Sequence, residues 1–175
     1  TATTEIYTPS LHDALPIYLL IARYEEGYYQ AATSLVEWAA DRIEATWTVF
    51  PILFVSHHAL ELSLKKVLGE VLNPVPEDVA AQHNLCVLWQ TLLKELKDRF
   101  QNAVPSNEKR IAKILSQLTS IDPDSLSSRY ATKKDFKTAY LRTRRTLDLE
   151  NLNVIVSKLY NEFNNIFEKI NNPDQ

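Results

Sequence analysis

The stretch LNVIVSKLYNEFNNIFEKI, residues 152–170, decides the fold class, because its apolar side chains recur at steps of three and four residues. These side chains are Leu152, Ile155, Val156, Leu159, Phe163, Ile166, Phe167 and Ile170. That spacing places them on one face of an amphipathic α-helix and marks this face as the one that packs on a core. We therefore predict a long helix in the last part of the chain.

The same periodicity occurs in four earlier segments, and it predicts helices at residues 20–42, 51–72, 85–100 and 107–121. In the first of these helices, the residues expected to face the core are Ile21, Tyr24, Tyr28, Ala31, Leu35 and Trp38. Residues 122–145 have no clean period and predict an irregular crossover before the last helix. Because short connections return each helix alongside the previous one, we predict an all-α antiparallel bundle of about five helices.

Composition limits the other possibilities. A chain of 175 residues with 45% hydrophobic residues can bury one core, so we expect a single domain at residues 18–175. The only glycines, Gly27 and Gly69, cannot supply the glycine-rich loops of nucleotide-binding α/β folds.

The lone Cys86 fits a reducing compartment, and we expect a cytoplasmic protein with no membrane segment and no cofactor. The net charge of −3 leaves no overall basic field, so contact with a nucleic acid requires a local patch.

The first seventeen residues, TATTEIYTPSLHDALPI (residues 1–17), look like a translated sequencing-library adapter. Pro9 and Pro16 flank a segment too short for a stable helix of its own, and no periodicity crosses Pro16. We expect residues 1–17 to be non-native and to take no part in the fold. On this interpretation the natural protein has lost an N-terminal stretch.

The segment expected to form the second helix carries His57, His58, Glu61 and Lys65, at spacings that place Glu61 beside both His58 and Lys65. A histidine held by a carboxylate is suited to act as a general base or a metal ligand. The structural alternative is that Glu61 links neighbouring helices through buried hydrogen bonds. Bundles that hold two metal ions use a carboxylate–histidine pair on each of two helices, and only one such cluster occurs here, so we expect no metal site.

A second group lies at the start of the third predicted helix, where Gln82, His83 and Asn84 follow one another. Exposed amides at a helix N-terminus bind anions, although a polar residue in this place is more often a cap. We therefore expect Asn84 to cap the helix. His83 joins His58 and Glu61 as a candidate catalytic residue.

The crossover is the one strongly basic stretch, with seven cations against the single acid Asp135 between residues 129 and 145. The candidate binding residues are Arg129, Tyr130, Lys133, Lys134, Lys137, Arg142, Arg144 and Arg145. Tyr130, Phe136 and Tyr140 lie among the cations, so the segment could hold phosphates by charge and bases by stacking. The alternative is a solvated loop in which Arg129 and Tyr130 pack against the bundle.

Four segments, taken in order, resemble bacterial HEPN-like proteins: FPILFVSHHALELSLKKVL at 50–68, QHNLCVLWQTLL at 82–93, IDPDSLSSRYATKKDF at 121–136 and LDLENLNVIVSKLYNEF at 147–163. The resemblance implies a bundle of four to five helices, often dimeric, of a kind frequent in toxin–antitoxin and phage-defence systems. Many such proteins are metal-independent ribonucleases in which an arginine is followed four to six residues later by a histidine. The positions that match the resemblance are His58, Glu61, Lys65, His83, Arg129 and Tyr130.

The arginine–histidine signature is missing from this chain, because no histidine has an arginine at the required distance before it. We therefore expect a non-catalytic HEPN-like module that binds RNA, a nucleotide or a partner protein in a bacterial defence, toxin–antitoxin or stress setting. One alternative is a metal-independent ribonuclease with an atypical site, in which Arg129 holds phosphate and His58 or His83 acts as the base. Another is a bundle that serves only dimerisation or assembly, consistent with the homodimer that the resemblance implies.

Overall fold

The computed structural model describes residues 17–40, 42, 47–121 and 147–173, and this part of the chain is an all-α bundle without strands, as predicted. Its elements, in order, are α1 (Ile17–Ala40), α2 (Val49–Val71), α3 (Glu77–Ala80), α4 (Leu85–Arg99), the 3-10 helix η2 (Gln101–Ala103), α5 (Glu108–Ile121) and α6 (Leu149–Asn171). The five predicted helices are all present within a few residues of their expected bounds. The single-turn helix α3 was not predicted.

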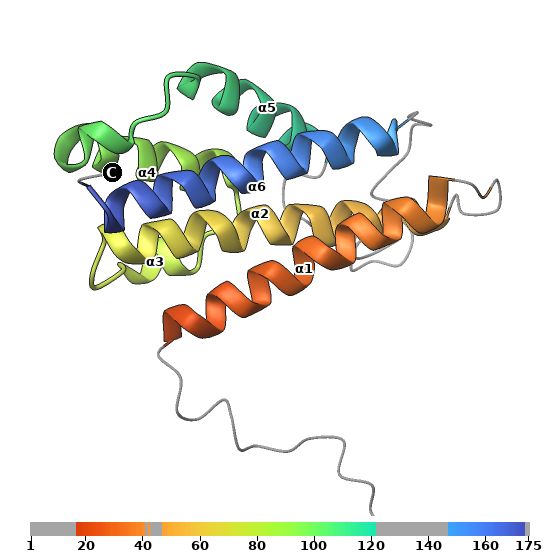
Figure 1. Cartoon of the computed structure of the whole chain (residues 1–175), viewed down its shortest axis with the longest axis horizontal. Coiled ribbons are helices and arrows are strands. Elements are labelled where there is room, and N and C mark those ends of the chain that lie inside the picture. Colours follow the sequence, from red (N-terminus) through yellow and green to blue (C-terminus); the bar gives the residue numbers. More distant parts are fainter. Residues whose placement is uncertain (1–16, 41, 43–46, 122–146, 174–175) are drawn as a thin grey trace, which may run out of the picture.

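Helix α2 lies at the centre of the bundle, between α1 and α6, and it also packs against α4 (Figure 1). Its apolar residues Leu60, Leu64 and Leu68 are completely buried. They meet Trp89 of α4 and Phe163 of α6, whose ring centroids lie 5.9 Å apart. The colours of Figure 1 show α1 and α2 running in opposite directions, whereas α2 and α6 run in the same direction. The antiparallel prediction therefore describes the first helix pair and not every pair in the bundle.

Polar caps fix the beginnings of α4 and α6. The Asn84 side chain accepts hydrogen bonds from the backbone amides of Cys86 and Val87, at 2.9 and 3.3 Å, which confirms the predicted cap. Asp148 caps α6 in the same way, accepting from the amide of Asn151 at 2.9 Å. This second cap explains why α6 begins at Leu149, before the first residue of the apolar stripe.

The predicted inward face of α1 is wrong by about one residue, although Leu35 does pack against the core as expected. Tyr24 and Trp38, expected in the core, keep 57% and 42% of their surface exposed. The residues that α1 buries instead are Glu25, Ala32, Val36 and Ala39. Both sets have helical spacing and differ by about 100° around the helix axis, so periodicity alone could not choose between them. The small residues on the second face allow α1 to lie close to α2, and a partner for Glu25 makes its burial possible.

Candidate functional site

Glu61 is the polar centre of the predicted site, and only 4% of its surface is exposed on α2. Its Oε1 accepts hydrogen bonds from Lys65 Nζ and from His83 Nδ1, each at 2.9 Å. Its Oε2 lies 3.8 Å from His58 Nδ1, which is an ion-pair distance rather than a hydrogen bond. The expected pairing of Glu61 with both neighbours on its own helix is confirmed, and the structure adds His83 as a third partner. We refer to Glu61, His58, Lys65 and His83 as the Glu61 cluster.

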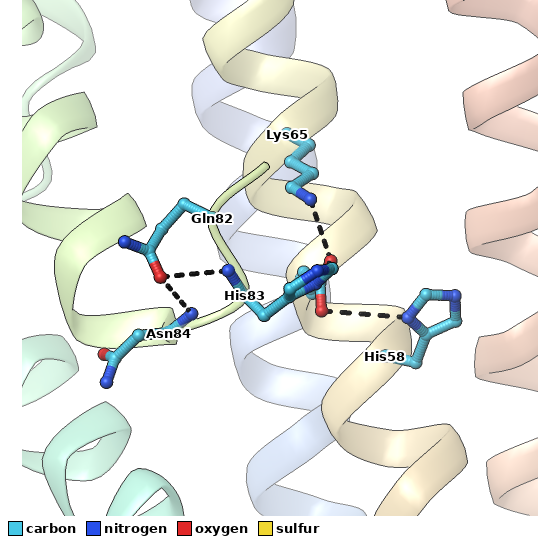
Figure 2. Close-up of polar contacts among 6 residues, drawn as sticks. His58, Lys65, Gln82, His83 and Asn84 are labelled. Atoms are coloured by element: carbon cyan, nitrogen blue, oxygen red, sulfur yellow. Dashed lines mark hydrogen bonds and ion pairs between the residues drawn. The ribbon is translucent and has the colours of Figure 1, made fainter. Parts of the chain in front are cut away.

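A short loop delivers His83 to Glu61 from outside α2. Gln82 Oε1 accepts hydrogen bonds from the backbone amides of His83 and Asn84, at 2.9 and 2.8 Å. Since Asn84 in turn caps α4, the chain from Gln82 onward is held by side-chain hydrogen bonds at successive residues. Figure 2 shows His83 extending from this loop toward α2, with Lys65 and His58 on either side. The cluster therefore ties the start of α4 to the central helix.

The charge of Glu61 is well stabilised despite its burial. Burial by itself raises the pKa of this carboxyl group, but the nearby His58, the hydrogen bond and charge of Lys65, and the hydrogen bond from His83 outweigh it and lower the pKa to about 2. Glu61 is thus an anion throughout the physiological range. Two ionisable imidazoles and one ammonium surround this single carboxylate.

The cluster reaches solvent mainly through His83. The His83 side chain is 60% exposed, whereas those of His58 and Lys65 are 29% and 18% exposed. The His58 ring is held between aromatic neighbours, with its centroid 4.4 Å from that of Tyr28 in an edge contact and 5.7 Å from that of Phe54 in a stacked contact. A histidine whose Nδ1 contacts a carboxylate presents Nε2 to the outside, which is how a general base is oriented. His57, next in sequence, is buried at the helix interface.

A second polar cluster, which the sequence did not reveal, lies between α1, α2 and α6. Lys66 Nζ lies 2.6 Å from Glu25 Oε2 and donates a hydrogen bond to Asn164 Oδ1 at 2.5 Å. Ser63 donates to Glu25 Oε1 at 2.5 Å. Glu25 is 1% exposed and Lys66 is 9% exposed, so both charges lie within the bundle. The sequence signal for this cluster was a charged residue, Glu25, at a position where the helix α1 is otherwise apolar. That signal could not identify the partner, because Lys66 lies 41 positions away on another helix.

Tyr160 of α6 extends this contact between helices along α1. It donates a hydrogen bond to Glu26 Oε2 at 2.5 Å, and its ring stacks on Tyr29 at a centroid distance of 4.0 Å. The hydrogen bonds from Tyr160 and Gln30 to Glu26 lower the pKa of that carboxyl group. Burial, followed by the hydrogen bond to Glu26, raises the pKa of Tyr160. These contacts serve to join α1 to α6.

The candidate binding residues of the basic stretch lie outside the described residues. They are Arg129, Tyr130, Lys133, Lys134, Lys137, Arg142, Arg144 and Arg145. Of the four candidate catalytic residues, the structure therefore brings together His58, Glu61 and His83, while the position of Arg129 relative to them stays a prediction.

Within the described ranges, no group of three or more histidine, cysteine, aspartate or glutamate side chains has an arrangement that could hold a metal ion. None of the helices there is both long and apolar enough to cross a membrane. No known family model matches the chain, and neither a curated protein nor a solved structure matches it.

Proposed function

We propose that this chain is a non-catalytic HEPN-like module that binds RNA in a bacterial defence, toxin–antitoxin or stress setting, with a nucleotide or a partner protein as the alternative ligands. The observation that carries the non-catalytic part is the engagement of Glu61 inside the chain: Lys65 and His83 hydrogen-bond to its Oε1, and His58 lies at an ion-pair distance from its Oε2. The single cysteine supports a cytoplasmic location as part of the proposal.

The contacts of Glu61 favour a structural role over a catalytic one. A general base must accept a proton near neutral pH, and a carboxyl group with a pKa of about 2 is a very weak base there. Lys65 and His83 each direct a nitrogen at the same carboxylate oxygen, so they are already engaged inside the chain. We infer that the Glu61 cluster positions the start of α4.

The basic stretch supports RNA as the ligand. Seven cations against one acid within residues 129–145 give this segment a local positive charge that the whole chain, at −3, does not have. Tyr130, Phe136 and Tyr140 add aromatic faces on which unpaired bases can stack. Charge provides affinity without sequence preference, and stacking favours single strands over duplexes.

Fluorescence anisotropy with a labelled single-stranded RNA, measured between about 50 and 200 mM salt, tests the proposal. We expect affinity to fall as salt rises, and simultaneous replacement of Lys133, Lys134 and Lys137 by alanine to reduce the slope by about two to three phosphate contacts. A matched variant with three exposed lysines of α4 and α5 replaced, Lys94, Lys109 and Lys113, should keep the slope. Absence of binding at about 50 mM salt would refute RNA binding and leave the partner-protein alternative.

The ribonuclease alternative has one specific observation in its favour. His83 is the most exposed member of the Glu61 cluster, and its Nδ1 contacts a buried carboxylate, as in sites where a histidine acts as base. Catalysis would still require a cation that holds the phosphate, and Arg129 is the residue predicted for that role. Metal-free RNA cleavage that is lost in both Arg129→Ala and His83→Ala would establish this alternative.

A further inference from the structure

Helices α1 and α6 are joined by three side-chain hydrogen bonds that follow one another along both helices. The bonded pairs, in order along α1, are Glu26 with Tyr160 at 2.5 Å, Tyr29 with Ser157 at 3.0 Å and Thr33 with Asn153 at 3.4 Å. The positions rise by three and then four residues on α1 and fall by the same steps on α6, so each helical turn adds one pair. The two helices are therefore antiparallel and meet along a polar edge, which we call the α1–α6 ladder.

A buried charge lies behind this ladder, where Glu25 of α1 enters between α2 and α6. Ser63 and Lys66 of α2 contact its two carboxylate oxygens at 2.5 and 2.6 Å. Lys66 also donates a hydrogen bond to Asn164 of α6 at 2.5 Å, and its Nζ lies 5.0 Å from the centre of the Phe167 ring. We refer to the face that α1 covers as the α1 seat, and its polar residues are Ser63, Lys66, Asn153, Ser157, Tyr160 and Asn164.

The apolar part of the α1 contact is small. To the buried core cluster of the described residues, α1 supplies only Val36 and Ala39, with Tyr29 and Leu35 packed partly against it. Helix α6, of nearly the same length, supplies a larger set, namely Leu152, Val156, Leu159, Phe163 and Ile166. Apolar burial is the main stabilising contribution, whereas side-chain hydrogen bonds exchange with water at a small net cost. Helix α1, at one edge of the bundle in Figure 1, is therefore held much less strongly than α6.

We propose that α1 is a displaceable helix, which opens as a unit while the rest of the bundle stays folded and which gives way to a partner helix of the same polar pattern. The charges of Glu25 and Lys66 regain water when α1 leaves, so their separation does not prevent the opening. The proposal does not depend on RNA binding, because it uses no residue of the basic stretch.

The α1 seat defines the chemistry of the partner. Helix α1 satisfies it with a carboxylate opposite Lys66 and with hydrogen-bonding groups at steps of three and four residues. A helix without the carboxylate would bury Lys66 unpaired, and this excludes a merely apolar partner. The partner is therefore an amphipathic helix with acidic and hydroxyl side chains along one edge.

Hydrogen exchange of the full chain tests the opening of α1. Protection factors from Glu25 to Ala39 should be similar to one another and about a hundredfold lower than those from Leu60 to Leu68 in α2. Helix α6 is the matched comparison and should keep the protection of α2. The variant Tyr29→Phe/Thr33→Val removes two pairs of the ladder and should lower the protection of α1 by about another tenfold, with α2 unchanged.

A labelled peptide with the sequence of α1, Ile17–Ala40, tests the α1 seat by fluorescence anisotropy with the full chain. Because the peptide competes with α1 of the chain, it should bind the Tyr29→Phe/Thr33→Val chain about tenfold more tightly than the wild type. A peptide that carries both substitutions should bind that chain about tenfold more weakly than the unsubstituted peptide. The control chain Tyr24→Phe/Ser34→Ala, which loses exposed hydroxyl groups of α1, should bind the peptide as the wild type does.

Two results would overturn the proposal. Protection of α1 within about threefold of that of α2 would mean that α1 opens only when the whole fold unfolds. A peptide that binds neither chain at about 100 μM, or binds both with the same Kd, would mean that α1 does not cover a site for another helix.

Discussion

The buried carboxylate of Glu61 should make the free energy of unfolding of this fold depend on pH. Replacing Glu61 by glutamine should remove that part of the pH dependence. Glutamine keeps the size and shape of the side chain but not the charge that Lys65 and His83 contact at 2.9 Å. At pH 7 we expect the free energy of unfolding to fall by about 2 to 4 kcal/mol, the range for breaking one side of a buried ionic contact.

The pH dependence gives a more specific magnitude. The pKa of Glu61 is lowered from its ordinary 4.5 to about 2 by the folded structure, and a difference of about 2.5 units corresponds to about 3 kcal/mol of stability. Because the folded pKa is the lower one, this stability is present above pH 4.5 and is lost as the pH falls toward 2. By linkage, about 2 kcal/mol should be lost between pH 7 and pH 3 and the remainder below that.

Urea unfolding followed by circular dichroism, at pH values from 7 to 3, measures this difference. The curves of wild type and Glu61→Gln should be furthest apart at pH 7 and should approach each other at pH 3. Glu70→Gln is the matched control, because Glu70 lies on the same helix, is half-buried and has no ion pair among the described residues. If the gap between wild type and Glu61→Gln were constant over this range, or no larger than the gap for Glu70→Gln, Glu61 would not be the stabilised anion inferred here.

Two further substitutions test the packing of the helices. Lys66→Met should lower the free energy of unfolding by about 3 to 5 kcal/mol, because it leaves Glu25 buried without its cation. Adding Glu25→Gln should recover part of that loss. Urea unfolding measures both variants, and a Lys66→Met variant as stable as the wild type would contradict the buried ion pair. Gly69→Ala should raise the free energy of unfolding by about 0.5 to 1 kcal/mol, because the added Cβ meets nothing within 4 Å and alanine favours the helical conformation more than glycine does. A lower melting temperature than that of the wild type would show that the position is crowded.

Local signals in the sequence predicted the helices and part of the site. The stripe of α6 and the cap at Asn84 depend on residues a few positions apart, and both are found as expected. The same holds for the contacts of Glu61 with His58 and Lys65, which follow from positions on one helix.

The remaining features depend on how helices meet in space. The orientation of α1 was predicted wrongly because its exposed aromatic stripe is as periodic as its buried one. The pairing of Glu25 with Lys66 joins two helices, and no local spacing identifies such a partner.

The central claim is that the chain binds RNA without cleaving it, and one incubation tests both parts. End-labelled single-stranded RNA is mixed with the protein in EDTA at about 50 mM salt, and bound fraction and strand length are measured from the same sample. We expect a bound strand of unchanged length, with His83→Ala binding as well as the wild type. Shortened RNA that is absent with His83→Ala, or no bound RNA at all, would contradict this claim.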